Sequence, residues 1–277
     1  MRHKLGKEAY FIKQFSSKHI GDDGAVLGKN VYSKDLFCEG IHFKREWMSL
    51  DKIAYKSMLV NISDAIAMNA KPDFALIGVV IPKTFTCKEL SLLADGFEKA
   101  AKAYGVEIIG GDTTAGDRLM ISITIGSHSS RPLMRKNAKV GDFVAFTGSL
   151  GKSYADLTRL LRGGNVSFKS RFVTPLLKQA FMEKAGKFLN AGMDISDGLS
   201  KDLSRLLYES GGRGIRWYQS MPKRILCSGE EYEMLFTFNV RQKKRLERIA
   251  KQTRTKVTII GRIKRGRYRC ICKEHHF

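Results

Sequence analysis

The chain has 277 residues, 43% of them hydrophobic, which is enough to bury one large core or two of ordinary size. Five prolines and 26 glycines, with apolar residues spread along the whole length, exclude a disordered or collagen-like protein. The formal net charge of +22 admits a polyanionic partner, but the sequence has no zinc-finger spacing and no RNP-type aromatic motif. We therefore interpret the charge as a solvated basic surface and do not expect a nucleic-acid partner.

The sequence also predicts the compartment. No run of about 18 uncharged apolar residues is present, so we expect no membrane span. Residues 1–8 lack the apolar core of a signal peptide, and an odd number of scattered cysteines is more typical of free thiols than of a disulfide framework. The prediction is a cytoplasmic protein with free thiols at Cys38, Cys87, Cys227, Cys270 and Cys272.

Hydrophobic periodicity predicts alternating strands and helices in the first half of the chain. Apolar residues at helical spacing indicate helices over residues 51–69 and 87–104, the second closed by Gly105. A continuous apolar run is typical of a buried strand, and alternation is typical of a half-buried one. Patterns of these kinds predict strands over 31–37, 74–81, 106–109 and 119–125.

The polar, basic segment 127–142 contains Pro132 and Gly141, and we place a domain boundary there, giving domains 1–130 and 131–277. The second domain continues the alternation. Its predicted strands are 143–147, 214–218, 233–238, 256–262 and 268–272. Its predicted helices are 153–162, 175–189, one from Leu199 to the Gly211-Gly212 pair, and a basic one near 241–252. Alternation in both halves predicts an α/β or α+β fold.

Aspartates stand out in a chain with 49 basic and only 27 acidic residues. Any one of them is typical of a turn or a helix N-cap. Together they favour a divalent metal, because Mg²⁺ prefers oxygen ligands and usually joins carboxylates to substrate phosphates. Neither a Walker pattern nor the glycine-rich loop of protein kinases is present, so another scaffold would have to hold a nucleotide. The aspartates beside glycines or near apolar strands are Asp23, Asp35, Asp64, Asp112, Asp194 and Asp197.

Seven segments and the last two residues, taken in order, form a more specific pattern. They are IGDDGAVL (20–27), SKDLFCEGIHF (33–43), NISDAIAMNAKP (61–72), IIGGDTT (108–114), LMRKNAKVGDFVAFTGSLG (133–151), MDISDGLSKDL (193–203), SGEEYEMLFT (228–237) and His276-Phe277. The ordered set resembles the thiamine-monophosphate kinase family, within the aminoimidazole-ribonucleotide synthetase-like superfamily, over nearly the whole chain. Single motifs such as DISDG occur across the superfamily, whereas the full set is similar to this branch.

The resemblance implies both an activity and a fold. The activity is phosphorylation of thiamine monophosphate to thiamine diphosphate, by direct in-line transfer of the γ-phosphoryl group of ATP with several Mg²⁺ ions. The fold is a two-domain aminoimidazole-ribonucleotide synthetase-like α/β (α+β) fold, with the N-terminal sheet pairing across a homodimer. Domain 1–130 would bind ATP and magnesium and dimerise, and domain 131–277 would complete the cleft that holds the active site.

The same resemblance assigns roles to individual residues. The expected metal ligands are Asp23, Ser33, Asp35, Asp64, Asp112, Asp194 and Asp197. ATP is expected to contact Gly111, Asp112, Arg135 and Ser196. Thiamine monophosphate is expected to contact His42, Glu230 and Phe277. Because the acceptor is already an ionised phosphate, no general base is assigned, and catalysis would depend on positioning and charge neutralisation.

Three departures from the family pattern leave alternatives open. Lys34 stands where relatives usually carry a small or hydroxyl residue, Ser228 stands in place of a glycine, and the stretch between Gly214 and Cys227 is shorter than usual. The alternatives are phosphorylation or ATP-dependent activation of another small molecule in the superfamily, or a basic nucleic-acid-binding protein on an inactive scaffold.

Overall fold

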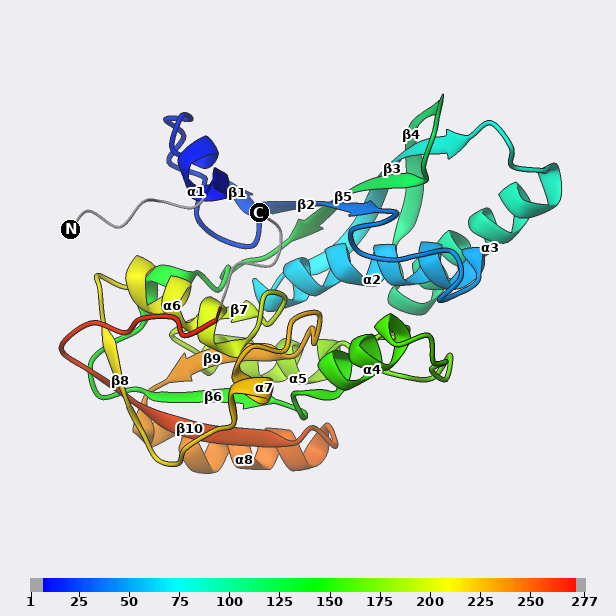
Figure 1. Cartoon of the computed structure of the whole chain (residues 1–277). Coiled ribbons are helices and arrows are strands. Elements are labelled where there is room, and N and C mark those ends of the chain that lie inside the picture. Colours follow the sequence, from blue (N-terminus) through cyan, green and yellow to red (C-terminus); the bar gives the residue numbers. More distant parts are fainter. Residues whose placement is uncertain (1–6, 273–277) are drawn as a thin grey trace.

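The protein consists of two five-stranded sheets with helices packed between and around them. The computed structural model describes residues 7–272. Figure 1 shows the two sheets as separate layers. No helix in the described range is long and apolar enough to cross a membrane. The predicted mixed α/β fold is confirmed, and the domain boundary after residue 130 stays a prediction.

The N-terminal sheet has the strand order β1-β2-β5-β3-β4. Strands β3 and β4 are parallel, and the other neighbouring pairs are antiparallel. A parallel pair needs a crossover connection, which α3 (Cys87–Tyr104) supplies. The short helix α1 (Lys7–Ile12) precedes the sheet. The strands of the sheet are β1 (Ala25–Leu27), β2 (Asn30–Cys38), β3 (Lys71–Pro82), β4 (Glu107–Gly116) and β5 (Met120–His128).

Local sequence sets both ends of α3. The side chain of Thr86 accepts a hydrogen bond from the backbone nitrogen of Glu89 at 3.3 Å, and Oε2 of Glu89 accepts one from the backbone nitrogen of Thr86 at 2.8 Å. The helix ends at Gly105, whose φ of 66° costs a glycine nothing sterically. The predicted helix over 87–104 is confirmed.

Helix α2 (Leu50–Ala67) lies between the two sheets and is buried along most of its length. It packs on β2, β3 and β5 of the N-terminal sheet, on α3, and on β7 of the second sheet. Buried polar side chains cost free energy unless they are paired, and two of those in this helix pair with the second half of the chain: Lys56 with Glu230 and Ser63 with Asp194. The buried polar residues of α2 are Lys56, Ser57, Asn61 and Ser63.

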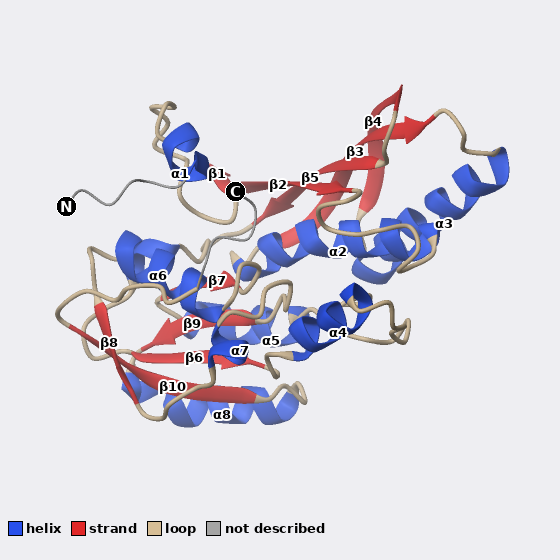
Figure 2. Ribbon diagram, in the orientation of Figure 1, coloured by secondary structure: helices blue, strands red, loops and turns tan. Residues whose placement is uncertain are grey.

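The second sheet has the order β7-β9-β6-β10-β8, and all its neighbouring strands are antiparallel. One face shares the main core with α5 and α8, and the other packs against α6 (Figure 2). The strands are β6 (Phe143–Thr147), β7 (Ala191–Asp194), β8 (Gly214–Trp217), β9 (Met234–Phe238) and β10 (Val257–Lys264). The helices are α4 (Lys152–Leu161), α5 (Gln179–Ala185), α6 (Leu199–Glu209), α7 (Lys223–Leu226) and α8 (Lys243–Gln252).

Two predicted elements of the second half were wrong. The helix predicted over 175–189 is reduced to α5 and a 3-10 turn at Gly186–Phe188. Segment 268–272 is not a strand, because it lies against the start of α6 instead of pairing with a sheet. There the hydroxyls of Ser200 and Tyr268 are 2.8 Å apart, and Ser200 Oγ accepts from the backbone nitrogen of Ile271 at 3.2 Å.

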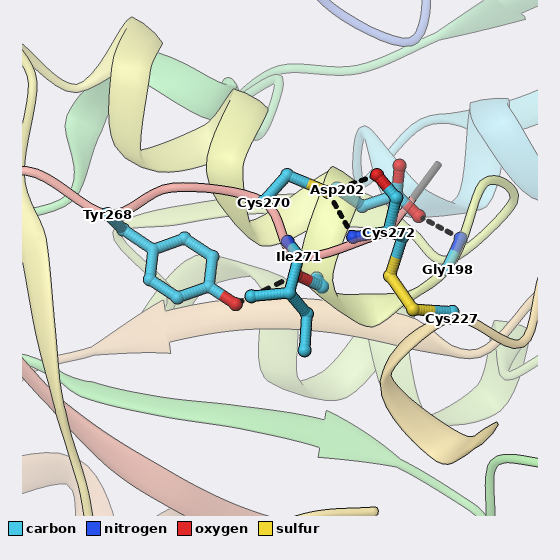
Figure 3. The surroundings of a disulfide bond; sticks show 8 residues. Gly198, Asp202, Cys227, Tyr268, Cys270, Ile271 and Cys272 are labelled. Carbon is cyan, nitrogen blue, oxygen red and sulfur yellow. Dashed lines mark hydrogen bonds between the residues drawn. A yellow bond between two sulfur atoms is a disulfide. The ribbon is translucent and has the colours of Figure 1, made fainter. Parts of the chain in front are cut away.

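The prediction of five free thiols was also wrong. Cys227 and Cys272 form a disulfide, although 45 positions separate them in the chain (Figure 3). No local pattern could reveal this pair, because it forms only when segment 268–272 folds back onto the end of α7. The cysteines that remain free are Cys38, Cys87 and Cys270.

Candidate active site

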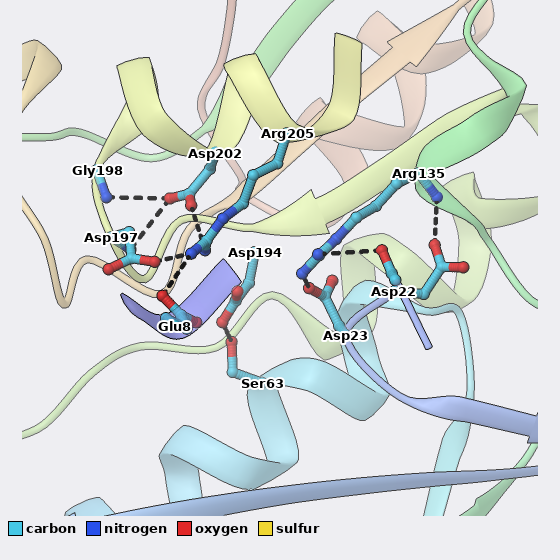
Figure 4. Close-up of polar contacts among 11 residues, drawn as sticks. Glu8, Asp22, Asp23, Ser63, Arg135, Asp194, Asp197, Gly198, Asp202 and Arg205 are labelled. Atoms are coloured by element: carbon cyan, nitrogen blue, oxygen red, sulfur yellow. Dashed lines mark hydrogen bonds and ion pairs between the residues drawn. The ribbon is translucent and has the colours of Figure 1, made fainter. Parts of the chain in front are cut away.

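Three aspartates from distant parts of the chain meet beside α2. Asp23 precedes β1, Asp64 belongs to α2, and Asp194 ends β7. Each contributes one carboxylate oxygen, and the three oxygens lie within 4.8 Å of one another. Figure 4 shows Asp23 and Asp194 in the same region, with Ser63 of α2 next to Asp194. The structure thus brings together three of the residues predicted to bind metal.

Asp35 joins them through hydrogen bonds between β2 and α2. Its backbone nitrogen donates to Asn61 Oδ1 at 2.7 Å, and Ser33 Oγ donates to the backbone oxygen of Asn61 at 3.1 Å. Ser33 and Asp35 are two residues apart on a strand, so both side chains face α2. The carboxyl group of Asp35 is also close enough to that of Asp64 for each to affect the pKa of the other. We call Asp23, Asp35, Asp64 and Asp194 the aspartate cluster.

Burial and mutual repulsion perturb the aspartate cluster. Burial raises the pKa of Asp64 well above its usual value, and the carboxylates of Asp35, Asp194 and Asp23 raise it further. The pKa of Asp194 is also raised, first by burial, while a hydrogen bond from Ser63 Oγ at 2.7 Å opposes the shift. Burial raises the pKa of Asp35 to about 6. Four carboxyl groups packed this closely favour binding of protons or cations.

Arg135 supplies positive charge at one side of the cluster. Its Nη2 forms an ion pair with Asp23 Oδ1, and its Nη1 donates to the backbone oxygen of Gly21 at 3.2 Å. Its backbone nitrogen donates to Asp22 Oδ1 at 2.6 Å (Figure 4). Burial acts to lower the pKa of Arg135, but Asp23 outweighs it and the pKa is raised. The guanidinium is a fixed fork of donors that suits either a carboxylate or a phosphate.

The turn after β7 holds Asp197 near these groups. Asp197 pairs with Arg205 Nη1 and with Lys201 Nζ at 3.3 Å, both on α6. The fully buried carboxylate of Asp202 accepts from the backbone nitrogens of Asp197 and Gly198 at 3.1 and 3.0 Å. Burial, with a smaller contribution from Asp197, raises the pKa of Asp202 to about 8. These contacts fix the turn and place two cations, Lys201 and Arg205, beside Asp197, and Figure 4 shows Arg205 in this position.

A second group of side chains lies nearer the start of α2. Lys56 Nζ is 2.7 Å from Glu230 Oε2 and 3.8 Å from the ring centre of Phe172. It is also 5.6 Å from the ring centre of Phe37, on which His42 stacks with ring centres 5.5 Å apart. Two residues predicted to contact the acceptor, His42 and Glu230, therefore share one neighbourhood. We call these five residues the Lys56 group.

The backbone that carries Glu230 has an uncommon conformation. Glu230 and Tyr232 have φ values of 54° and 50°, a region that costs free energy for residues other than glycine. The nitrogen of Glu230 donates to the backbone oxygen of Ser196 at 2.7 Å, and Ser153 Oγ donates to the backbone oxygen of Glu230 at 2.7 Å. Ser196, a predicted ATP contact, thus directly supports the segment that carries a predicted acceptor contact.

Other predicted residues lie apart from both groups. Asp112 and Gly111 are exposed on β4, an edge strand. Asp112 is in register with Gly78 of β3, and Gly78 with Ser122 of β5. Ser122 lies between two buried isoleucines of β5, so this row is on the sheet face turned away from α2. The roles of Asp112 and Gly111 stay predictions, and Phe277 is outside the described residues.

Three residues that hold the site together were not singled out in the sequence. Ser63 donates to Asp194, Asp202 holds the turn after β7, and Lys56 is bonded to Glu230. Ser63 and Asp202 lie inside quoted motifs, where they resemble ordinary helix residues. The available signal for Lys56 was a charged residue among the apolar positions of a helix, which is uncommon in a core.

The donors of the aspartate cluster fit a hard divalent cation. Oδ2 of Asp23 is buried and has no hydrogen-bond partner among the residues that the structure describes. Carboxylate oxygens are preferred ligands of Mg²⁺, whereas zinc is usually bound by cysteine and histidine. The three oxygens within 4.8 Å of one another, from Asp23, Asp64 and Asp194, would therefore suit magnesium.

The sequence and the two-sheet fold match a known class of protein. Residues 21–127 match the family model described as AIR synthase related protein, N-terminal domain. The chain is 34% identical to the thiamine-monophosphate kinase of Buchnera aphidicola subsp. Schizaphis graminum, over 89% of this chain and 84% of the relative. It is 30% identical to that of Pyrococcus horikoshii, over 92% of this chain and 86% of the relative.

A solved structure agrees with these relatives. AaThiL complexed with AMPPCP and TMP is similar with a TM-score of 0.86 and 27% identity, over 99% of this chain and 97% of that chain. The fold is therefore that of the AIR synthase related class. The chain belongs to the thiamine-monophosphate kinase family, a family of phosphotransferase enzymes, and the resemblance carried by the motifs is confirmed.

Proposed function

We propose that the protein transfers the γ-phosphoryl group of ATP to thiamine monophosphate, in line, and forms thiamine diphosphate, with Mg²⁺ held by the aspartate cluster. The observation that carries this proposal is the cluster itself. Carboxyl groups from four separate segments gather at one place in a chain with a net charge of +22. The names of the relatives and the ligands named for AaThiL support the choice of substrates.

The chemistry of such a site suits transfer between two anions. ATP and the acceptor phosphate repel each other, and Mg²⁺ at the cluster would neutralise part of that charge as it builds up on the transferred group. Arg135, now paired with Asp23, would offer its donors to a phosphate oxygen of ATP. The acceptor phosphate is already ionised, so the residues need only orient it and exclude water.

The Lys56 group would hold the other end of the acceptor. Glu230 carries a carboxylate that can accept a hydrogen bond from, or partly neutralise, a cationic heterocycle. His42 and Phe37 provide a stacked pair of rings beside it. Both the Lys56 group and the aspartate cluster include residues of α2, so one elongated substrate can contact both.

We also propose that the active unit is a homodimer. The face of the N-terminal sheet turned away from α2 exposes Leu36, Leu76 and Met120 to 53%, 40% and 38%. Exposed apolar patches of this kind mark association surfaces, and a second copy would cover this one. Asp112 is on the same face and three strand spacings, about 14 Å, from β2. In a dimer, Gly111 and Asp112 of one copy would serve the aspartate cluster of its mate.

The test is ADP release with thiamine monophosphate, ATP and Mg²⁺, with identification of thiamine diphosphate as the product. Thiamine itself is the matched control acceptor, because it lacks the phosphate that must be phosphorylated. We expect turnover with thiamine monophosphate only, and loss of turnover in EDTA. ADP release with a different phosphorylated acceptor, and none with thiamine monophosphate, would contradict the proposed substrate. A cytoplasmic location is proposed with this activity.

A further inference from the structure

Lys56 has an environment that a purely structural lysine rarely occupies. Its side chain is 0% exposed, although lysines normally extend their ammonium group into water. Burial of an ammonium group is costly unless partners replace its hydration. Here Oε2 of Glu230 at 2.7 Å and the ring of Phe172 at 3.8 Å are such partners. The bond to Glu230 joins residues 174 positions apart, one in each predicted domain.

One carboxylate oxygen of Glu230 is held by a hydrogen bond, and part of the side chain is exposed to solvent. Its side chain keeps 24% of its surface exposed, and its Oε2 accepts from Lys56. Its backbone has the positive φ described above and is tied to Ser196 and Ser153. With backbone and one carboxylate oxygen both fixed, the orientation of the remaining oxygen is fixed as well. Lys56 therefore controls the direction in which Glu230 faces a ligand.

Helix α2 also sets a distance between this carboxylate and the aspartate cluster. Lys56 and Ser63 are seven residues apart, which places them on the same side of the helix and about 10 Å apart along its axis. Lys56 binds Glu230, and Ser63 donates to Asp194 at 2.7 Å. The two contacts therefore hold Glu230, which would face the heterocycle, and Asp194, which would face the metal, at two points about 10 Å apart along α2. Thiamine monophosphate likewise carries an aminopyrimidine at one end and a phosphate at the other.

We propose that Lys56 is a positioning and specificity-determining residue, which orients Glu230 to accept a hydrogen bond from the heterocyclic end of the acceptor. The acceptor class is a phosphate monoester with a hydrogen-bond-donating heterocycle, such as an aminopyrimidine, about 10 Å from the phosphate. ATP binds at the cluster and does not depend on this contact. The inference rests on the proposed function and deepens it.

The test compares Lys56→Met with Lys56→Arg in steady-state assays that vary thiamine monophosphate and ATP separately. Methionine fills similar space without the charge or the donors. We expect KM for thiamine monophosphate to rise about 10- to 100-fold, the effect of losing a charged hydrogen bond, with KM for ATP changed less than about twofold. Arginine should restore part of the acceptor affinity. Unchanged KM for thiamine monophosphate, or equal rises in both KM values, would overturn the inference.

Glu230→Gln provides a second and independent measurement. If Lys56 acts through Glu230, then Lys56→Met should change KM for thiamine monophosphate much less in the Glu230→Gln background than in the wild type. Full additivity of the two effects would overturn the inference, and so would failure of both Lys56 variants to fold, judged by thermal unfolding. A wild type that releases no ADP with thiamine monophosphate would instead overturn the proposed function.

Discussion

Replacing Asp64 with asparagine should stabilise the metal-free protein and abolish its activity. The carboxylate oxygens of Asp23, Asp64 and Asp194 lie within 4.8 Å, so each ionised pair costs about 3.5 kcal/mol at an effective dielectric constant of 20. Proton uptake relieves part of this cost, because burial and the neighbouring carboxylates raise the pKa of Asp64. We expect a net gain of about 1–3 kcal/mol, or roughly 2–5 °C in Tm for a chain of 277 residues.

The assay is thermal unfolding in EDTA and then in Mg²⁺, together with ADP release. Asparagine keeps one oxygen but no charge, so Mg²⁺ should raise the Tm of Asp64→Asn less than that of the wild type, and turnover should fall by about 100-fold or more. Asp142→Asn is the matched control. Oδ2 of the buried Asp142 accepts from Lys139 N and Asn190 Nδ2, each at 2.9 Å, so this change should lower Tm. A lower Tm for Asp64→Asn in EDTA would refute the electrostatic reasoning.

Two further predictions concern the dimer and the disulfide. Asp112→Asn and Asp64→Asn should each be inactive alone. After the two variants are mixed in equal amounts and their subunits exchange, half of the dimers should be mixed, and each mixed dimer should have one intact site of two. Turnover should therefore recover to about a quarter of the wild-type value. No recovery would place Asp112 in the site of its own chain. Reduction, or Cys227→Ser with Cys272→Ser, opens a link between residues 45 positions apart and should cost about 4 kcal/mol on the chain-entropy account. A Tm that does not change with reductant would count against the disulfide.

Much of the fold could be predicted because it depends on local patterns. Helix α3 has a capping box at Thr86 and a glycine at its end, and the alternation along β5 follows the burial of Ile121, Ile123 and Ile125. The predictions failed where contacts with a part of the chain distant in sequence set the conformation of a segment. Segment 268–272 has the apolar and β-branched content of a strand. It forms no strand ladder, because a hydroxyl of α6 and a disulfide fix it instead.

The sequence predicted which carboxylates could form the site, because aspartates beside glycines and strand ends are visible in the order of the residues. Tertiary structure alone decided which of them meet. It joined Asp194 to Ser63 over 131 positions and Glu230 to Lys56 over 174, and it left Asp112 on the opposite face of the sheet. The physical reason is that local periodicity specifies which side of an element is buried, whereas the neighbour on that side depends on how whole layers pack.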